Sequence, residues 1–171
     1  VIPMMFKAVG ADIKQLEIIK GSSCQNNPKY FLDLLKLSTK SSIHDAKKAG
    51  SEVVKTSNNP KLSGLLYPLM QALDEEYLGV DVQYGGVDQR KILMFAREYL
   101  PKIGYKPRIE VMTPLLPGLV GKKMSASDPN SKIDLLDNTK TVAKKLKKAE
   151  CVSGVIEDNG ILAFLKHVIF V

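Results

Sequence analysis

The sequence contains little cysteine and little histidine. Of 171 residues, only two are cysteines and two are histidines. Cys24 and Cys151 lie too far apart for any metal motif, and two distant thiols are typical of a protein from a reducing compartment. His44 and His167 are too few and too separated for a zinc site, so we interpret them as surface or capping residues and expect no protein-bound metal.

Long hydrophobic runs are also absent. No apolar stretch approaches the ~20 residues of a membrane-spanning helix, and residues 1–21 lack the basic segment and apolar stretch of a signal peptide. We therefore expect a cytoplasmic protein without membrane contact. The chain begins without methionine and stops inside an apolar, helix-like run, so we expect it to be an internal piece of a longer protein.

Acidic residues are fewer than basic ones, with 18 Asp and Glu against 25 Lys and Arg. The formal net charge is +7, which suits a polyanionic partner such as nucleic acid or nucleotide phosphates. Aromatic residues make up only 6% of the chain and are not interleaved with basic residues, so base stacking on a single strand is not indicated.

The order of predicted elements indicates an α/β fold. Short apolar or alternating runs predict strands at 16–20, 80–84 and 108–112. Helical patterns follow them: one starts at Pro28, one is capped by Ser42 and ended by Gly50, and others cover 64–78, begin at Asp88, cover 138–149 and begin near 159. In the third of these helices we expect Pro68 in the first turn, where proline is best tolerated. Strands alternating with helices predict a parallel sheet, and the purely helical pattern after residue 138 predicts a second, helical domain.

Two loops follow predicted strands, where parallel sheets bind their ligands. The first is "QYGGVDQRK", in which Gly85 and Gly86 leave room for a ligand near the backbone and Asp88 could accept ribose hydroxyls. The alternative is a tight turn with Asp88 as a helix cap.

The second loop is "VGKKMSASDPNSK". Lys122 and Lys123 supply ammonium groups, and Ser125 and Ser127 supply hydroxyl and backbone donors. These groups suit a polyphosphate. The alternative is a solvated surface loop.

A third set of polar residues lies on one predicted helix. Tyr67, Gln71 and Asp74 are spaced i, i+4 and i+7, which places a phenol, an amide and a carboxylate on one face. Such a line suits a small polar ligand, and the alternative is a hydrogen-bonded row at a domain edge.

Taken together, these stretches resemble the tyrosyl-tRNA synthetases of the eukaryotic and archaeal cytoplasmic type. The resemblance rests on "LLYPLMQALDEEYLGVDVQYGGVDQRKILMFAREYLP", "LLPGLVGKKMSASDPNSKIDLLD" and "KKLKKAECVSGVIEDNGILAFLKHVIF". The segment "KMSAS", Lys123–Ser127, resembles the class I signature KMSKS, with Ala126 where many members have a second lysine.

The resemblance implies a Rossmann-like catalytic domain, of which 1–137 is the carboxyl-terminal part, and the start of a helical anticodon-binding domain at 138–171. Residues from about 35 to 60 match the connective insertion, which implies a homodimer interface near the tRNA acceptor stem. The family's HIGH signature would precede residue 1, so we expect the fragment alone to be inactive.

The resemblance also implies an activity and its residues. Tyrosine and ATP would give tyrosyl-adenylate, and the tyrosyl group would then pass to tRNA(Tyr), with Mg²⁺ accompanying ATP and no other cofactor. Asp74 would bind the substrate phenol, and Tyr67, Gln71 and Gln89 its amino-acid end. The implied ATP-binding residues are Gly86, Asp88, Leu116, Lys123 and Met124, and the implied catalytic residues are Lys123, Ser125 and Ser127.

Two alternatives stay open. A tryptophanyl-tRNA synthetase shares the fold and has a similar "KMSASDPNS" loop, although the Tyr67, Gln71 and Asp74 face and the "SKIDLLD" continuation favour tyrosine. A non-catalytic RNA-binding or regulatory protein derived from a synthetase is the other.

One predicted helix is crowded with lysines, namely Lys144, Lys145, Lys147 and Lys148. We expect this helix to face the tRNA backbone, and the alternative is a solvated helix face.

Overall fold

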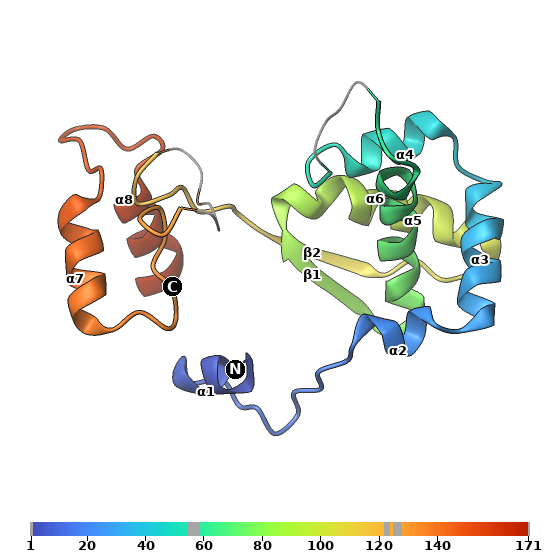
Figure 1. Ribbon diagram of the computed structural model, residues 1–171, viewed down its shortest axis with the longest axis horizontal. Coiled ribbons are helices and arrows are strands. Elements are labelled where there is room, and N and C mark those ends of the chain that lie inside the picture. Colours follow the sequence, from blue (N-terminus) through green and yellow to red (C-terminus); the bar gives the residue numbers. More distant parts are fainter. Residues whose placement is uncertain (1, 55–58, 122–123, 125–127, 171) are drawn as a thin grey trace. The chain divides into compact units, whose positions relative to one another are not determined.

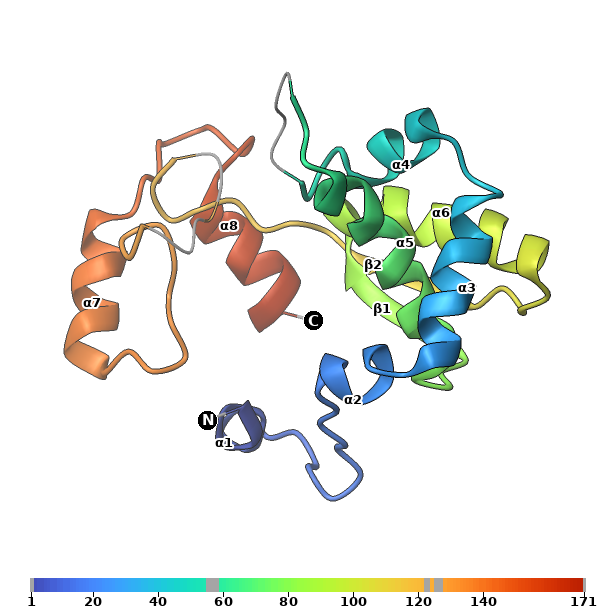
Figure 2. The same ribbon diagram turned by 45° about the vertical axis from the view of Figure 1, so that its right-hand side comes forward.

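The computed structural model describes residues 2–54, 59–121, 124 and 128–170 (Figures 1 and 2). The chain divides into two compact units. One comprises Glu17–Pro114, and the other combines Val1–Leu16 with Leu115–Val171. Each unit is described by itself below.

The 17–114 unit is a layer of helices against a parallel strand pair. Its elements are α2 (Gly21–Gln25), α3 (Pro28–Ser38), α4 (Ile43–Gly50), α5 (Leu62–Tyr77), β1 (Val82–Gly86), a 3₁₀ turn (Val87–Gln89), α6 (Arg90–Tyr99), a second 3₁₀ turn (Leu100–Ile103) and β2 (Ile109–Thr113). This order confirms the α/β class.

The starts of α3 and α4 confirm the predicted signals. Pro28 occupies the first turn of α3, and the side chain of Asn27 accepts a hydrogen bond from the backbone N–H of Lys29 at 2.9 Å. Ser42 begins α4 with a reciprocal capping box, in which its side chain accepts from the Asp45 N–H and the Asp45 carboxylate accepts from the Ser42 N–H. Both arrangements satisfy backbone donors that a helix start otherwise leaves unpaired.

The prediction for Pro68 was wrong in one respect. Helix α5 begins at Leu62, two residues before the predicted start, so Pro68 lies inside the helix and not in its first turn. Proline there removes one backbone hydrogen bond. Its side chain is fully buried, and this burial helps to offset the loss.

Strands β1 and β2 pair in parallel, with Val82 opposite Ile109 and Gly86 opposite Thr113. Helix α6 connects them and packs on β1, which makes a βαβ unit. On the other face, Val82, Tyr84, Ile109 and Val111 are exposed. Parallel sheets are normally covered on both faces, so the described residues supply only one of the two covering layers.

The predicted strand at 16–20 is wrong. These residues are irregular and exposed, and no strand among the described residues pairs with them. An isolated β-prone run lacks the ladder of hydrogen bonds that defines a strand, so the pattern of Leu16, Ile18 and Ile19 does not produce one alone.

One apolar cluster holds the helices of this unit together. It consists of Tyr30, Leu34, Leu37, Ala46, Ala49, Leu69, Ala72, Leu73, Ile92, Phe95, Ala96, Tyr99 and Leu100. The cluster is supplied by α3, α4, α5, α6 and the turn after α6, so the helix carrying the predicted ligand face is anchored from several sides.

The second unit is helical and irregular. It contains α1 (Ile2–Ala8), α7 (Thr139–Lys148), α8 (Gly160–Phe164) and a π turn (Leu165–Ile169), which confirms the helices predicted near 138–149 and 159. A side chain at Gly160 would place its Cβ 2.1 Å from the carbonyl oxygen of Gly118, so the start of α8 requires glycine there. Across the described parts of both units, no helix has the length and apolar character needed to cross a membrane.

Candidate functional site

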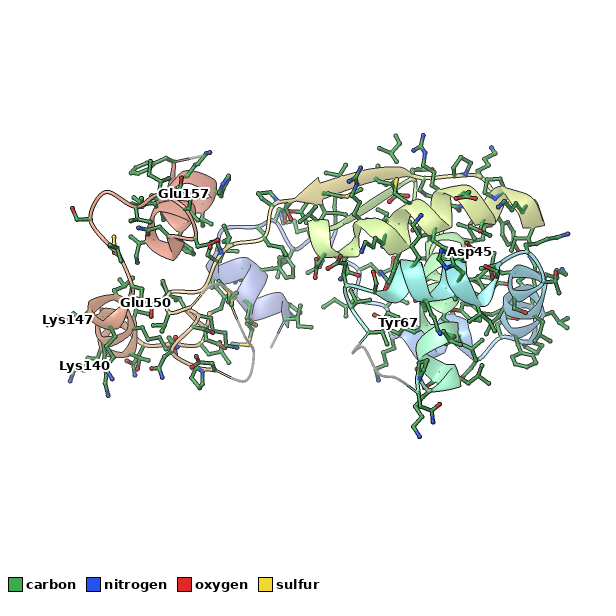
Figure 3. All side chains as sticks on the ribbon, turned by 90° about the horizontal axis from the view of Figure 1, so that it is seen from above. Asp45, Tyr67, Lys140, Lys147, Glu150 and Glu157 are labelled. Carbon is green, nitrogen blue, oxygen red and sulfur yellow. The ribbon has the colours of Figure 1, made fainter. Side chains whose placement is uncertain are left out.

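The predicted ligand face lies on α5. Tyr67, which is labelled in Figure 3, is 48% exposed, whereas Gln71 and Asp74 are partly buried. At 1.5 Å per residue, the seven positions from Tyr67 to Asp74 cover about 10 Å of helix.

Gln71 and Gln89, two residues that the resemblance assigns to the amino-acid end of the substrate, are in contact with each other. The Nε2 group of Gln71 donates to Oε1 of Gln89 at 3.1 Å, and Nε2 of Gln89 donates to Oδ2 of Asp88 at 3.3 Å. Oε1 of Gln71 is buried and has no hydrogen-bond partner among the described residues. A buried amide oxygen of this kind favours a donor from outside the protein, such as a ligand ammonium group.

The carboxylate of Asp74 is held by two residues that the sequence did not point to. Gln25, on α2, donates from Nε2 to both oxygens, at 3.1 Å to Oδ1 and 3.3 Å to Oδ2. The hydroxyl of Tyr30, on α3, lies 2.9 Å from Oδ1 and also 2.8 Å from the carbonyl oxygen of Met70. Tyr30 belongs to the apolar core of the unit, and a core tyrosine needs a partner for its hydroxyl, but a helical sequence pattern does not identify that partner.

The environment of Tyr30 keeps its hydroxyl protonated. Burial of the ring, followed by the hydrogen bond to Asp74 and the negative charge of that residue, raises the pKa of Tyr30 well above its usual value. Tyr30 is therefore a donor to Asp74 throughout the physiological pH range.

A second carboxylate lies in the same contact between α3 and α5. Asp33 accepts hydrogen bonds from Tyr77 at 2.7 Å, from Lys36 at 2.9 Å and from Tyr105. Burial raises the pKa of Asp33, but the hydrogen bonds from Tyr105, Lys36 and Tyr77 outweigh it and hold the pKa below its usual value. Asp33 is only 2% exposed, so its carboxylate is closed to any ligand.

Glu75, on α5, is a third carboxylate, and the described part of the chain gives it no donors of the kind that surround Asp33. Oε2 of Glu75 and both carboxylate oxygens of Glu110 are buried and lack hydrogen-bond partners among the described residues. Burial, together with the nearby charge of Glu110, raises the pKa of Glu75 to about 8, against the opposing effect of Arg108. Arg108 itself is engaged elsewhere, in an ion pair with Glu76 at 2.6 Å.

The loop after β1 begins at the carboxyl edge of the strand pair. Gly86 ends β1 opposite Thr113 of β2, and Asp88 lies in the 3₁₀ turn that leads into α6. A Cβ at Gly85 would meet the side chain of Gln89 at 3.5 Å, which is an ordinary contact distance, so the expected ligand space at Gly85 stays a prediction. Gly86 and Asp88 are thus at the edge where parallel sheets bind ligands.

Lys123, Ser125, Ser127 and Ala126 of the KMSAS segment lie outside the described residues, as does Lys122. Met124 is 37% exposed, and Leu116 is partly buried in the segment before the loop. The structure thus describes the positions of these two residues, and their assignment to ATP stays a prediction.

The two ends of this loop are joined. The N–H of Leu119 donates to the carbonyl of Ser131 at 2.8 Å, and the N–H of Glu150 donates to the carbonyl of Leu119 at 2.7 Å. The carboxylate of Glu150 also accepts from the N–H of Gly121 at 3.0 Å. The start and end of the KMSAS loop are thus fixed on the segment that follows α7.

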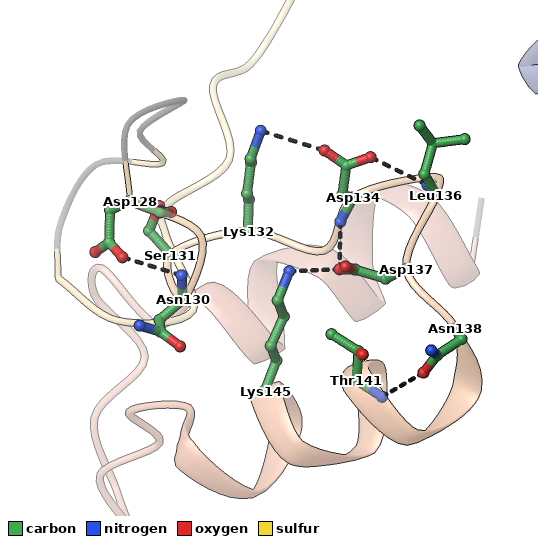
Figure 4. Close-up of polar contacts among 10 residues, drawn as sticks. All are labelled: Asp128, Asn130, Ser131, Lys132, Asp134, Leu136, Asp137, Asn138, Thr141 and Lys145. Atoms are coloured by element: carbon green, nitrogen blue, oxygen red, sulfur yellow. Dashed lines mark hydrogen bonds and ion pairs between the residues drawn. The ribbon is translucent and has the colours of Figure 1, made fainter. Parts of the chain in front are cut away.

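Charged pairs continue this framework downstream (Figure 4). Lys132 lies 3.4 Å from Asp134, and Lys145 of α7 pairs with Asp137. The hydrogen bond from Lys145 lowers the pKa of Asp137, and the backbone N–H of Leu136 lowers that of Asp134.

Helix α7 carries lysines of two kinds. Lys145 is buried in its ion pair, so the expectation that it faces a polyanion with its neighbours was wrong. Lys140, Lys144, Lys147 and Lys148 are exposed and line one shallow hollow with Ala143. Figure 3 shows Lys140 and Lys147 projecting from α7.

Both cysteines are free. Within residues 2–54, 59–121, 124 and 128–170, no group of three or more histidine, cysteine or acidic side chains is arranged to hold a metal ion.

Comparison with known proteins gives consistent matches. A family model described as tRNA synthetases class I (W and Y) matches residues 4–171. The cytoplasmic tyrosine–tRNA ligase of Gallus gallus is 56% identical over 170 residues, which are 99% of this chain and 32% of that protein. The Saccharomyces cerevisiae cytoplasmic tyrosine–tRNA ligase is 53% identical over 169 residues, 98% of this chain and 43% of that protein.

A solved structure agrees in fold. The tyrosyl-tRNA synthetase of Archaeoglobus fulgidus, crystallised with L-tyrosine, superposes with a TM-score of 0.89 and is 41% identical, over 98% of this chain and 52% of that one. The chain thus spans about a third to a half of the relatives that it matches.

Proposed function

The chain belongs to the class I tRNA synthetases of the tryptophan and tyrosine type, and from that premise we propose that it is a segment of a cytoplasmic tyrosine–tRNA ligase. Two features support this proposal. The relatives above carry that name at 53–56% identity, and α5 presents Tyr67, Gln71 and Asp74 in the order that one tyrosine molecule would need.

The observation that carries the choice of substrate is the incomplete hydrogen bonding along this face. Oδ2 of Asp74 has only a 3.3 Å contact with Gln25, and Oε1 of Gln71 has no partner among the described residues. We assign the first oxygen to the substrate phenol and the second to its ammonium group, with Tyr67 and Gln89 beside the ammonium. An indole has no hydroxyl to offer Asp74, so the same face disfavours tryptophan.

The reaction needs positioning and charge neutralisation more than proton transfer. The tyrosine carboxylate is ionised at neutral pH and attacks the α-phosphorus of ATP, with pyrophosphate leaving. Gly86, Asp88, Leu116 and Met124 are assigned to the nucleotide, which binds with Mg²⁺. Lys123, with Ser125 and Ser127, is assigned to the leaving pyrophosphate, where one such donor is typically worth about 3–4 kcal/mol in the transition state.

The other partners are assigned by surface. Exposed Phe31, Leu32, Leu35 and Ile43 make an apolar surface on α3 and at the start of α4, which supports a homodimer through this region and the 35–60 insertion. The exposed lysines of α7 support contact with the tRNA backbone. The domain boundary near 137 belongs to the same proposal.

The test is amino-acid-dependent ATP–pyrophosphate exchange by the full-length protein that contains residues 1–171. Exchange with tyrosine and not with tryptophan is the expected result. Exchange with tryptophan alone would assign the chain to the sister specificity, and exchange with neither amino acid would favour a non-catalytic derivative. Sedimentation of the same sample tests the homodimer.

A further inference from the structure

Helices α3 and α5 exchange two partly buried phenol–carboxylate bonds. Tyr30 of α3 donates to Asp74 of α5 at 2.9 Å, and Tyr77 of α5 donates to Asp33 of α3 at 2.7 Å. The two rings meet edge to face, with centroids 4.8 Å apart. The bonds are therefore close in chemistry, burial and location.

The two carboxylates differ in what remains open to a ligand. Among the described residues, Asp33 has three side-chain donors and is closed. Asp74 is partly exposed, and Tyr30 and Gln25 both contact Oδ1, whereas the same part of the chain gives Oδ2 only the longer bond from Gln25. Tyr30 thus fixes one oxygen of a carboxylate whose other oxygen keeps most of its capacity to accept.

The hydroxyl of Tyr30 is itself fixed from behind. It lies 2.8 Å from the carbonyl oxygen of Met70, which belongs to the same helix as Asp74. The hydroxyl has a single proton and two acceptors within reach, so it is held between the backbone and the carboxylate of α5. The ring is 2% exposed and cannot turn away from this position without disturbing the core.

We propose that Tyr30 is a positioning residue for substrate selection: it orients the Asp74 carboxylate so that Oδ2 faces the hydroxyl of the bound amino acid. This inference rests on the proposed function. A carboxylate whose orientation is fixed before binding loses less freedom when the substrate arrives and discriminates more sharply against an amino acid without a hydroxyl.

Tyr30→Phe in the full-length protein tests the inference, with Tyr77→Phe as the matched control. Each variant removes one phenol–carboxylate bond and keeps the ring. We expect Tyr30→Phe to raise the KM for tyrosine in pyrophosphate exchange roughly five- to tenfold with little change in kcat. The use of phenylalanine should stay unchanged, so the tyrosine-to-phenylalanine ratio falls by the same factor. Tyr77→Phe should lower the melting temperature comparably but leave the ratio as in the parent.

A double-mutant cycle asks whether Tyr30 acts through Asp74. In an Asp74→Asn background, Tyr30→Phe should have much less effect on the ratio, because the oriented carboxylate is already gone. Equal ratios in Tyr30→Phe and Tyr77→Phe overturn the inference. So does a Tyr30→Phe protein that fails to fold while Tyr77→Phe folds, because the hydroxyl is then structural. A parent protein that activates no tyrosine removes the proposed function itself, and that result is visible before any variant is made.

Discussion

Asp33 and Asp74 both lie where α3 packs on α5, but they differ in the hydrogen-bond donors that surround them among the described residues. Asp33 accepts from two phenols and an ammonium group and is closed to solvent. Asp74 accepts from one phenol and one amide and stays partly exposed. The comparison teaches that the number of donors, together with burial, separates a carboxylate that holds the fold from one that is available to a ligand.

The largest effect should come from removing the saturated carboxylate. Asp33→Ala leaves the hydroxyls of Tyr77 and Tyr105 without their acceptor, and we expect the free energy of unfolding to fall by about 3–4 kcal/mol. Denaturant unfolding of the full-length protein measures it. Asp33→Asn keeps an acceptor oxygen and should lose clearly less. A loss below that of Asp74→Ala would break the comparison.

Removing the open carboxylate should act on substrate use instead. Asp74→Ala removes a hydrogen bond to a charged group, which costs roughly 1.5–3 kcal/mol of transition-state stabilisation. We therefore expect kcat/KM for tyrosine to fall about 10- to 150-fold. Stability should change little, because the hydroxyl of Tyr30 keeps the carbonyl of Met70 as an acceptor. Pyrophosphate exchange with tyrosine and phenylalanine, beside a melting curve, makes the measurement. Lost stability with an intact amino-acid preference would make Asp74 structural.

The sequence predicted the open carboxylate better than the saturated one. Tyr67, Gln71 and Asp74 were found because polar residues at i, i+4 and i+7 share one face of the predicted helix. Asp33 and Gln25 were not singled out, since the two phenol donors of Asp33 lie 44 and 72 residues away and Asp74 lies 49 residues from Gln25. Local patterns carry no information on such contacts.

The same limit explains the errors in the fold. The start signals of the two helices, Pro28 for α3 and the Ser42 cap for α4, are local and were predicted correctly, as were the two strands that pair with each other. The run at 16–20 has strand composition but no neighbouring strand among the described residues. Lys145 was grouped with exposed lysines, because its partner Asp137 could not be identified from helix periodicity.

A third carboxylate extends the comparison to pH. Glu75 is next to Asp74 on α5, but it is buried without adequate donors, and burial with the charge of Glu110 raises its pKa to about 8. In the folded protein Glu75 keeps its proton up to about pH 8, whereas in the unfolded chain it loses the proton near pH 4.5. The contribution of Glu75 to stability is therefore complete below pH 4.5 and declines until about pH 8. Asp33 has a lowered pKa, and its contribution is present above about pH 4 and is lost as the pH falls below it.

Glu75→Gln should therefore flatten the decline in stability between pH 5 and 8, by about 1–2 kcal/mol. Denaturant unfolding at pH 5, 6.5 and 8 measures this difference, with Glu76→Gln as the control from the same helix. Parallel pH profiles for the parent and Glu75→Gln would show that Glu75 is ionised in the folded protein throughout this range.

The smallest expected effect concerns the lysines of α7, of which one is paired and buried and others are exposed. Lys145 of α7 is buried against Asp137, whereas Lys144, Lys147 and Lys148 are exposed. If the exposed lysines contact tRNA phosphates, each lysine changed to glutamine should weaken tRNA binding a few-fold and reduce the slope of log affinity against log salt concentration by about 0.7–0.9. Lys145→Gln should instead lower the melting temperature, since it leaves Asp137 without its ammonium partner.

Binding of tRNA(Tyr) to the full-length protein at several salt concentrations tests the first statement, with exposed Lys106→Gln as the control for loss of net charge, and a melting curve tests the second. An unchanged slope in the triple variant of Lys144, Lys147 and Lys148 would make these lysines a solvated helix face.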